Sequence, residues 1–260
     1  MSPLRCVSSV RFRKPIPLLA SLAAILAAGI AGCGATAHHS AATPAAASST
    51  PSSAAGSPAQ GGSSSIPAED VAVVNGTPIT ATSFEHWLQV LTYSNAAEHG
   101  GAPVVPDPPD FTNCIAEART IVKLAHETTQ NLKNDCEALL ASDTGQTMDF
   151  LIKNVWLEQA AARAHVDPSA AEVQDTFAAQ KDKEFKSAAA FNAFLVATKQ
   201  TSMDIVLRIR INQILSALAK RTDGVKALET ELQFAYRPKT HCAADYAISD
   251  CAGSSATSSS

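Results

Sequence analysis

The sequence VAVVNGTPI, residues Val71–Ile79, is the most informative local pattern in the chain. Its valines favour extended backbone and flank Asn75-Gly76, the dipeptide that best tolerates the positive φ angles of a type I′ turn. The stretch therefore predicts a β-hairpin. Thr80 or Thr82 can cap a helix directly after it, because a threonine hydroxyl accepts a hydrogen bond from a first-turn amide. That helix would carry apolar residues at helical spacing, namely Phe84, Trp87, Leu88 and Leu91.

Most of the chain beyond this helix shows the hydrophobic spacing of further helices. The Gly- and Pro-rich segment Gly100–Pro109 interrupts the pattern and is expected to be an exposed loop. Apolar stripes then run over Cys114–Ala125, Leu132–Leu140, Met148–Gln159, Val173–Phe177, Phe191–Leu195, Val206–Leu218 and Val225–Phe234. Helix boundaries are indicated by Asp167-Pro168, with Pro in a first turn, by the caps Ser187 and Thr201 or Ser202, and by a break at Asp223-Gly224. We expect a mainly α domain with a small N-terminal hairpin over residues 71–252.

The N-terminus carries the pattern of an export signal. Basic residues at Arg5, Arg11, Arg13 and Lys14 precede the apolar run Ile16–Ile30, which is short for a membrane span of roughly 20 residues. The run ends in Ile30-Ala31-Gly32-Cys33, which matches the lipobox of bacterial lipoproteins residue for residue. We expect residues 1–32 to be removed as a signal peptide and Cys33 to carry a lipid anchor on the extracytoplasmic face of the cell membrane. The alternative is an uncleaved anchor with an incidental cysteine.

Low-complexity segments flank the expected domain. Residues 33–70 consist largely of Ala, Ser, Thr, Pro and Gly, so they cannot bury enough apolar surface to offset chain entropy. We expect them to be a disordered tether with a reach of roughly 30–35 Å, and residues 253–260 to be a disordered tail. His38 and His39 lie in the tether, where two adjacent ligands on a flexible chain do not make a metal site.

The charge balance argues against nucleic-acid binding. The chain has 20 Lys and Arg against 24 Asp and Glu, and four of the basic residues lie in the leader. The remainder therefore carries a formal charge of about −8, which disfavours both a nucleic-acid surface and a polybasic membrane patch.

Four cysteines remain after the leader and Cys33 are set aside. An even number in an oxidising compartment indicates two disulfides, and the short spacings favour Cys114 with Cys136 and Cys242 with Cys251 among the three possible pairings. If the segments around the first pair are antiparallel helices, the bond joins a helical hairpin. A zinc site assisted by His241 is the alternative, but the chain lacks a close Cys-x-x-Cys pair. We expect no metal or other cofactor.

The segment Lys239–Cys251 is polar and bracketed by cysteines, and Tyr246 and Ile248 alternate as in a strand. A two-stranded hairpin is only marginally stable alone. We therefore expect this segment to add a strand to the hairpin at Val71–Ile79, which would bring both ends of the domain together.

The stretch Val71–Thr80, followed by Phe84, resembles the opening of SurA- and PrsA-type foldases, which have a valine strand, Asn-Gly and an Ile-Thr that leads into a helix. Further likenesses to the SurA N-terminal chaperone domain lie at Phe150–Ile152, Trp156–Glu158, Ala164–Asp167, Glu172-Val173, Thr201–Met203 and Arg208–Arg210. The cysteine-bearing stretches Asp110–Cys114, Leu132–Cys136 and Thr240–Cys251 resemble a version of this domain in actinobacterial lipoproteins. The resemblance implies a SurA-like helical chaperone domain that binds unfolded or exported polypeptides.

The chain also departs from the foldase pattern. In such foldases a parvulin prolyl-isomerase domain usually separates the helical region from the C-terminal segment, whereas here only about Thr222–Tyr236 lies between them. A parvulin domain needs several strands and helices, so there is no room for it at this place. The resemblance therefore implies chaperone ancestry without isomerase catalysis.

The residues themselves indicate binding better than catalysis. The chain lacks a P-loop and the G-x-G-x-x-G, H-E-x-x-H and G-x-S-x-G motifs, and its histidines are scattered, so we expect no enzyme and no catalytic residues. Large adaptable side chains suit a surface that binds unfolded polypeptides, and the candidates are Trp87, Trp156, Phe177, Phe185, Phe191, Phe194 and Met203. For each of these the alternative is a place in the core.

Two functions remain open from the sequence. The first is a membrane-tethered, ATP-independent chaperone or holdase for exported proteins. The second is a non-catalytic adaptor or structural lipoprotein that binds one specific protein partner. A wide apolar surface would favour the first, whereas a flat, well-packed surface with one small patch would favour the second.

Overall fold

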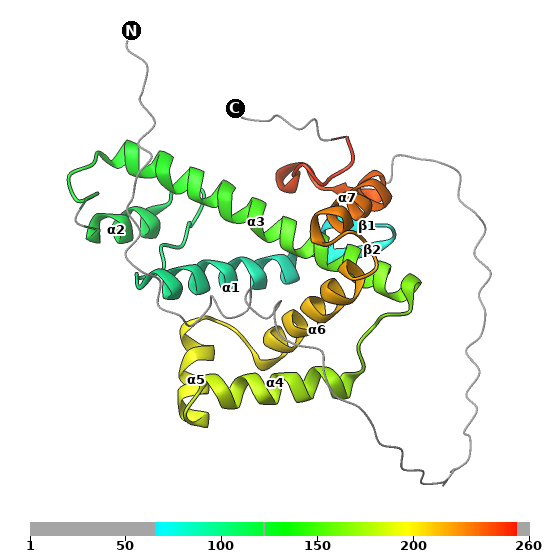
Figure 1. Ribbon diagram of the computed structural model, residues 1–260. Helices are drawn as coiled ribbons and strands as arrows, with labels where there is room; N and C mark the ends of the chain where they lie inside the picture. The colour runs from blue at the N-terminus through cyan, green and yellow to red at the C-terminus, as the bar shows by residue number, and fades with distance from the viewer. Residues whose placement is uncertain (1–65, 122, 254–260) are drawn as a thin grey trace, which may run out of the picture. The chain divides into compact units, whose positions relative to one another are not determined.

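The computed structural model describes residues 66–121 and 123–253 (Figure 1). The expected signal peptide, the lipidation site Cys33, the tether up to residue 65 and the tail from residue 254 lie outside the described residues. The described part is mainly helical, with one small antiparallel sheet.

The sheet contains the hairpin that the Asn-Gly pair predicts. Strands β1 (Asp70–Val74) and β2 (Thr77–Thr80) pair antiparallel, and the turn residues Asn75 and Gly76 have φ angles of 47° and 86°. Both angles are positive, as a type I′ turn requires.

A C-terminal strand joins this hairpin, as expected. Strand β3 (Thr240–Cys242) pairs antiparallel with β1, which becomes the central strand in the order β2-β1-β3. The position of the strand differs from the prediction, because Tyr246 belongs to the short helix η3 (Ala244–Tyr246) and Ile248 follows it without strand pairing. The disulfide from Cys242 to Cys251 closes a short loop here, so the chain turns back after three paired residues.

The first three helices follow the sequence signals only in part. Helix α1 (Ala81–His99) is capped by the hydroxyl of Thr80, which accepts a hydrogen bond from the Ser83 amide at 3.2 Å. Helix α2 (Thr112–Thr120) ends earlier than the apolar stripe predicts. Helix α3 (Thr129–Ala164) is one continuous helix of 36 residues where the sequence shows two separate stripes.

The remaining helices begin at serine and threonine caps or at a glycine break. They are α4 (Ala170–Glu184), α5 (Ala188–Ala197), α6 (Ser202–Ala219) and α7 (Val225–Tyr236), and the short helix η2 (Arg237–Lys239) leads into β3. Ser187 caps α5 and Thr201 caps α6, as predicted. Pro168 lies just before the cap Ser169 and not in the first turn, because Ser169 and Glu172 form a reciprocal capping box that sets the start of α4.

The main core lies where the sheet packs against α1, α3, α6 and α7. Trp156 of α3 is at its centre, 2% exposed, and its indole Nε1 donates a hydrogen bond to Thr240 Oγ1 at 3.0 Å. The same hydroxyl donates to the Tyr236 carbonyl at 3.0 Å. This chain of bonds ties the C-terminal strand to the long helix.

Two disulfides join the cysteine pairs that their spacing favours. Cys114 and Cys136 link α2 to α3 with a Cα–Cα distance of 6.2 Å, and Cys242 and Cys251 close the C-terminal loop at 5.8 Å. These disulfides argue against the zinc alternative, because a cysteine in a disulfide has no thiolate with which to bind a metal. Cys114, Cys136 and Phe111 form a small apolar cluster separate from the main core.

Candidate functional site

The two tryptophans belong to the core and not to a binding surface. Trp87 is 4% exposed and Trp156 is 2% exposed. Trp87 packs against Phe150 with ring centroids 4.6 Å apart, and Trp156 stacks on Tyr236. The expectation that these indoles contact a bound polypeptide is corrected, because their large apolar area is already used in folding.

The four phenylalanines of the candidate set come together where α4 meets α5. Phe177 lies on α4, Phe185 follows its end, and Phe191 and Phe194 lie on α5. Ring centroids are 5.9 Å apart for Phe177 and Phe191, 5.2 Å for Phe185 and Phe191, and 5.1 Å for Phe185 and Phe194. We call these four residues the aromatic cluster. Only Phe191 is buried, and the other three rings are half-buried.

Helix α5 is apolar in composition, but only part of its apolar surface is buried. Its sequence, AAAFNAFLVA, contains no charged residue, and Asn192 is its one polar side chain. Phe191 is its single buried residue, although such a composition is typical of a helix that is covered on several sides. Phe194 and Leu195 are half-buried, whereas Val196 and the alanines of α5 are exposed.

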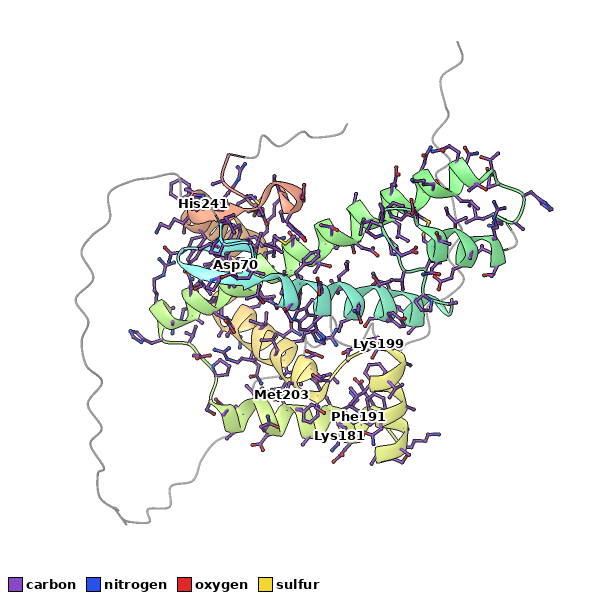
Figure 2. All side chains as sticks on the ribbon, turned by 180° about the vertical axis from the view of Figure 1, so that it is seen from behind. Asp70, Lys181, Phe191, Lys199, Met203 and His241 are labelled. Atoms are coloured by element: carbon purple, nitrogen blue, oxygen red, sulfur yellow. A yellow bond between two sulfur atoms is a disulfide. The ribbon has the colours of Figure 1, made fainter. Side chains whose placement is uncertain are left out.

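Exposed aliphatic side chains extend the apolar surface near the cluster. Val196 at the end of α5 is 74% exposed, and Met203 in the first turn of α6 is 67% exposed. Figure 2 shows Met203 in the same region of the molecule as Phe191 and Lys181. Of the predicted set, Met203 is thus the residue with the greatest access to a partner.

Lysines border this apolar surface. The Lys181 ammonium group lies 5.8 Å from the Phe177 ring centroid and 6.0 Å from that of Phe191. Lys199, which follows α5, lies 5.2 Å from the Tyr93 ring centroid. Phe185, Lys181 and Lys186 also line a shallow pocket of about 370 Å³ at the α4–α5 turn. The surface combines aromatic faces with cations, which attract each other.

A polar network positions the turn between α5 and α6. Gln200 donates to the Ser94 hydroxyl at 3.0 Å and accepts a hydrogen bond from Arg208. Arg208 also lies over the Trp87 ring, with its Cζ 6.0 Å from the centroid. Burial lowers the pKa of Arg208, and the negative charge of Asp204 opposes this effect. The network attaches the base of α5 to α1.

His86 and Asp204 pair beside this network without forming a catalytic relay. His86 Nε2 lies 2.9 Å from Asp204 Oδ1, and the amide and hydroxyl of Thr201 donate to Oδ2. Burial alone would raise the pKa of Asp204, but the hydrogen bonds from Thr201 and His86 lower it overall. The Thr201 hydroxyl also accepts a hydrogen bond from the Asp204 amide, which completes a reciprocal capping box at the start of α6. The arrangement is a helix cap.

No group of three His, Cys, Asp or Glu side chains in residues 66–121 and 123–253 has the geometry to hold a metal ion. Every helix in this part of the chain is too short or too polar to serve as a membrane span. The apolar surface of α5 is therefore the strongest candidate for function.

Phe234 is an exposed aromatic residue that was not among the predicted binding residues. Phe234 of α7 is 87% exposed, the most of any large apolar side chain in the described residues. The signal was present, because Leu228, Leu232 and Tyr236 are buried at a spacing of four, which places residue 234 on another face of the helix.

A search of family models, of curated proteins and of solved structures finds no match to this chain.

Proposed function

We propose that this chain is an extracytoplasmic lipoprotein, anchored through Cys33, whose helical domain acts as an ATP-independent chaperone or holdase for exported polypeptides. The observation that carries the proposal is α5, an apolar helix of 10 residues with a single buried residue. A soluble domain gains nothing in stability from such a surface, whereas a protein that binds unfolded chains needs one.

The chemistry of the surface fits clients without a fixed sequence. Burial of apolar area is non-directional, so any exposed hydrophobic segment gains free energy on contact. Full burial of a side chain such as Val196 or Met203 contributes about 1.5–3 kcal/mol, which is enough for transient capture when several side chains act together. Methionine adapts its shape to different partners.

The likeness to the SurA N-terminal chaperone domain supports the same function. The domain that carries this sequence resemblance is mainly helical, with a small antiparallel sheet in which the C-terminal strand pairs with β1. The stretch where an isomerase domain would be inserted is occupied by α7 and its short connections. We therefore propose binding without prolyl-isomerase catalysis.

The experiment measures suppression of light scattering by an aggregating client protein. The mature chain should suppress aggregation, and the pair Val196→Ser and Met203→Gln should reduce this effect several-fold without changing the circular dichroism spectrum. Phe234→Gln is the matched control, because it removes an equally exposed apolar side chain from α7. Equal loss of aggregation suppression in both variants would mean that the surface of Val196 and Met203 has no special role.

A prolyl-isomerase assay on the same preparations tests the second half of the proposal. Isomerase activity comparable to that of a parvulin enzyme would refute the non-catalytic assignment. If the wild-type chain leaves aggregation unchanged, the chaperone proposal fails, and the adaptor that binds one specific partner becomes the better hypothesis.

A further inference from the structure

A groove of about 350 Å³ lies between α3 and the C-terminal loop. One wall is the α3 segment from Glu137 to Gly145, the other is Asp245–Ile248, and Phe111 also lines the groove. None of the aromatic cluster lines this groove. It is a second surface, independent of the one proposed to bind clients.

Part of the lining of the groove is apolar. Phe111 is buried, and Leu140, Tyr246 and Ile248 are half-buried. The Tyr246 ring is held by an edge contact with Phe84, with centroids 4.9 Å apart. Such preorganisation lowers the entropy lost on binding.

Both disulfides brace the walls. Cys114–Cys136 joins α2 to α3 beside Phe111, in the same small cluster as Leu140. Cys242–Cys251 closes the loop that carries Tyr246 and Ile248. The two sides of the groove are thus covalently fixed within their own segments.

Gly145 leaves the α3 wall of the groove without a side chain. It lies inside the long helix α3, where glycine is less stable than alanine. A Cβ added at this position would meet no atom within 4 Å, so the fold itself does not exclude a side chain there. The other glycines of the described residues lie in turns and loops. A glycine on the groove wall allows a bound chain to approach the helix backbone closely.

Two carboxylates indicate the charge of the occupant. Glu137 and Asp245 line opposite walls of the groove and are exposed. Neither makes a salt bridge or a side-chain hydrogen bond with any other residue that the structure describes. Their negative charges are therefore available to a cationic partner.

We propose that this groove binds a polypeptide segment in which a bulky apolar side chain is flanked by Lys or Arg. The apolar side chain lies on Leu140, Tyr246 and Ile248, its backbone passes over Gly145, and its cations pair with Glu137 and Asp245. This selectivity goes beyond the proposed chaperone function, which requires no particular sequence.

The test uses the full mature chain and a fluorescently labelled peptide, Gly-Ser-Lys-Leu-Lys-Ser-Gly, with binding followed by anisotropy. Two peptides serve as controls, one with Ser in place of Leu and one with Glu in place of both Lys. The proposal expects binding of the first peptide and at least tenfold weaker binding of both controls. If the Ser peptide bound as tightly as the Leu peptide, binding would depend on charge alone and the proposal would be wrong.

Protein variants locate the site. Gly145→Leu should weaken peptide binding about tenfold or more, and Gly145→Ala should weaken it less, with the melting temperature of both at or above that of the wild type. Glu137→Gln with Asp245→Asn should weaken binding roughly two- to thirtyfold, the range expected for two exposed ion pairs. Wild-type affinity in Gly145→Leu would refute the groove as the site.

A final comparison separates this proposal from the chaperone function. The pair Val196→Ser and Met203→Gln should bind the peptide like the wild type while it loses suppression of aggregation. Gly145→Leu should lose peptide binding and should suppress aggregation like the wild type. If the Val196→Ser, Met203→Gln variant lost peptide binding and Gly145→Leu did not, the peptide would bind at the surface of Val196 and Met203, and the groove proposal would be wrong.

Discussion

Removal of the Cys114–Cys136 disulfide should unfold one part of the molecule and leave the rest folded. The perturbation is the pair Cys114→Ala and Cys136→Ala. The disulfide belongs to a small cluster with Phe111 that is separate from the main core. Helix α2 has only nine residues, and a helix of that length is not stable alone in water. The folding of α2 therefore depends on its apolar contacts in this cluster and on the disulfide to α3.

The magnitude follows from the length of the closed loop. The cysteines are 22 positions apart, so the bond lowers the conformational entropy of the unfolded chain and raises its free energy by about 3.4 kcal/mol at room temperature. The apolar contacts of one small cluster cannot replace that amount. We expect the segment from Gly100 to Thr128 to open locally, whereas the helices packed on the sheet keep their contacts.

Hydrogen exchange measured by mass spectrometry is the assay, because it reports local opening segment by segment. Peptides from residues 100–128 should lose protection in the variant, and peptides from α6 and α7 should keep it. The matched control is Cys242→Ala with Cys251→Ala, which opens a loop with a separation of nine and removes about 2.6 kcal/mol. Cys251 belongs to the main core, so this control variant should lose protection from hydrogen exchange in the main core. Loss of protection in α6 and α7 of the first variant would refute the reasoning.

Three further variants test single interactions. Thr240→Val leaves the buried indole N–H of Trp156 without its acceptor, so we expect a loss of about 1–3 kcal/mol in urea unfolding. Burial raises the pKa of Asp143 above its ordinary 3.8, partly offset by a hydrogen bond from Thr92, so the folded state holds the proton more tightly. Stability should fall as pH rises from 3.8 through this higher pKa, and Asp143→Asn should abolish that fall and raise the melting temperature at neutral pH. Gly145→Ala should stabilise the chain by about 0.5–1 kcal/mol in urea unfolding.

Features fixed by neighbouring residues could be predicted from the sequence. The hairpin follows from Asn75-Gly76, because few other dipeptides accept two positive φ angles in succession. The starts of α1, α5 and α6 follow from Thr80, Ser187 and Thr201, whose side chains accept hydrogen bonds from first-turn amides. These signals act over a few residues and do not depend on what the helices pack against.

Features set by distant contacts could not be predicted in the same way. Helix α3 continues through Asp143, Thr144 and Gly145, a polar stretch with a glycine that separates the two apolar stripes. The continuity depends on tertiary partners: Asp143 accepts a hydrogen bond from Thr92 of α1 at 3.1 Å, and Met148 is buried in the core. Tertiary contacts of this kind override local propensity.

The candidate site shows the same division. The sequence identified large apolar side chains, but residue type alone does not say which face of a helix is covered. Trp87 and Trp156 are enclosed by elements that are far away in the sequence, including α6 and β3. Met203 and the aromatic cluster lie on the helices that follow α3, where fewer elements cover them.

The separation of the aromatic cluster from the core explains how an apolar helix can stay exposed in a stable protein. No residue of α4 or α5 belongs to the main core cluster, so the stability of the core does not require α5 to be covered. Its position is set by the aromatic cluster, which packs it against α4, and by Gln200 just after it, which bonds to Ser94 of α1 and to Arg208 of α6. In Figure 1, α1 lies between α5 and the α2–α3 pair, so the groove beside α3 and the apolar surface of α5 are built on different elements. A substitution on one surface should therefore leave the free energy of binding at the other unchanged, because distant sites without shared partners act additively.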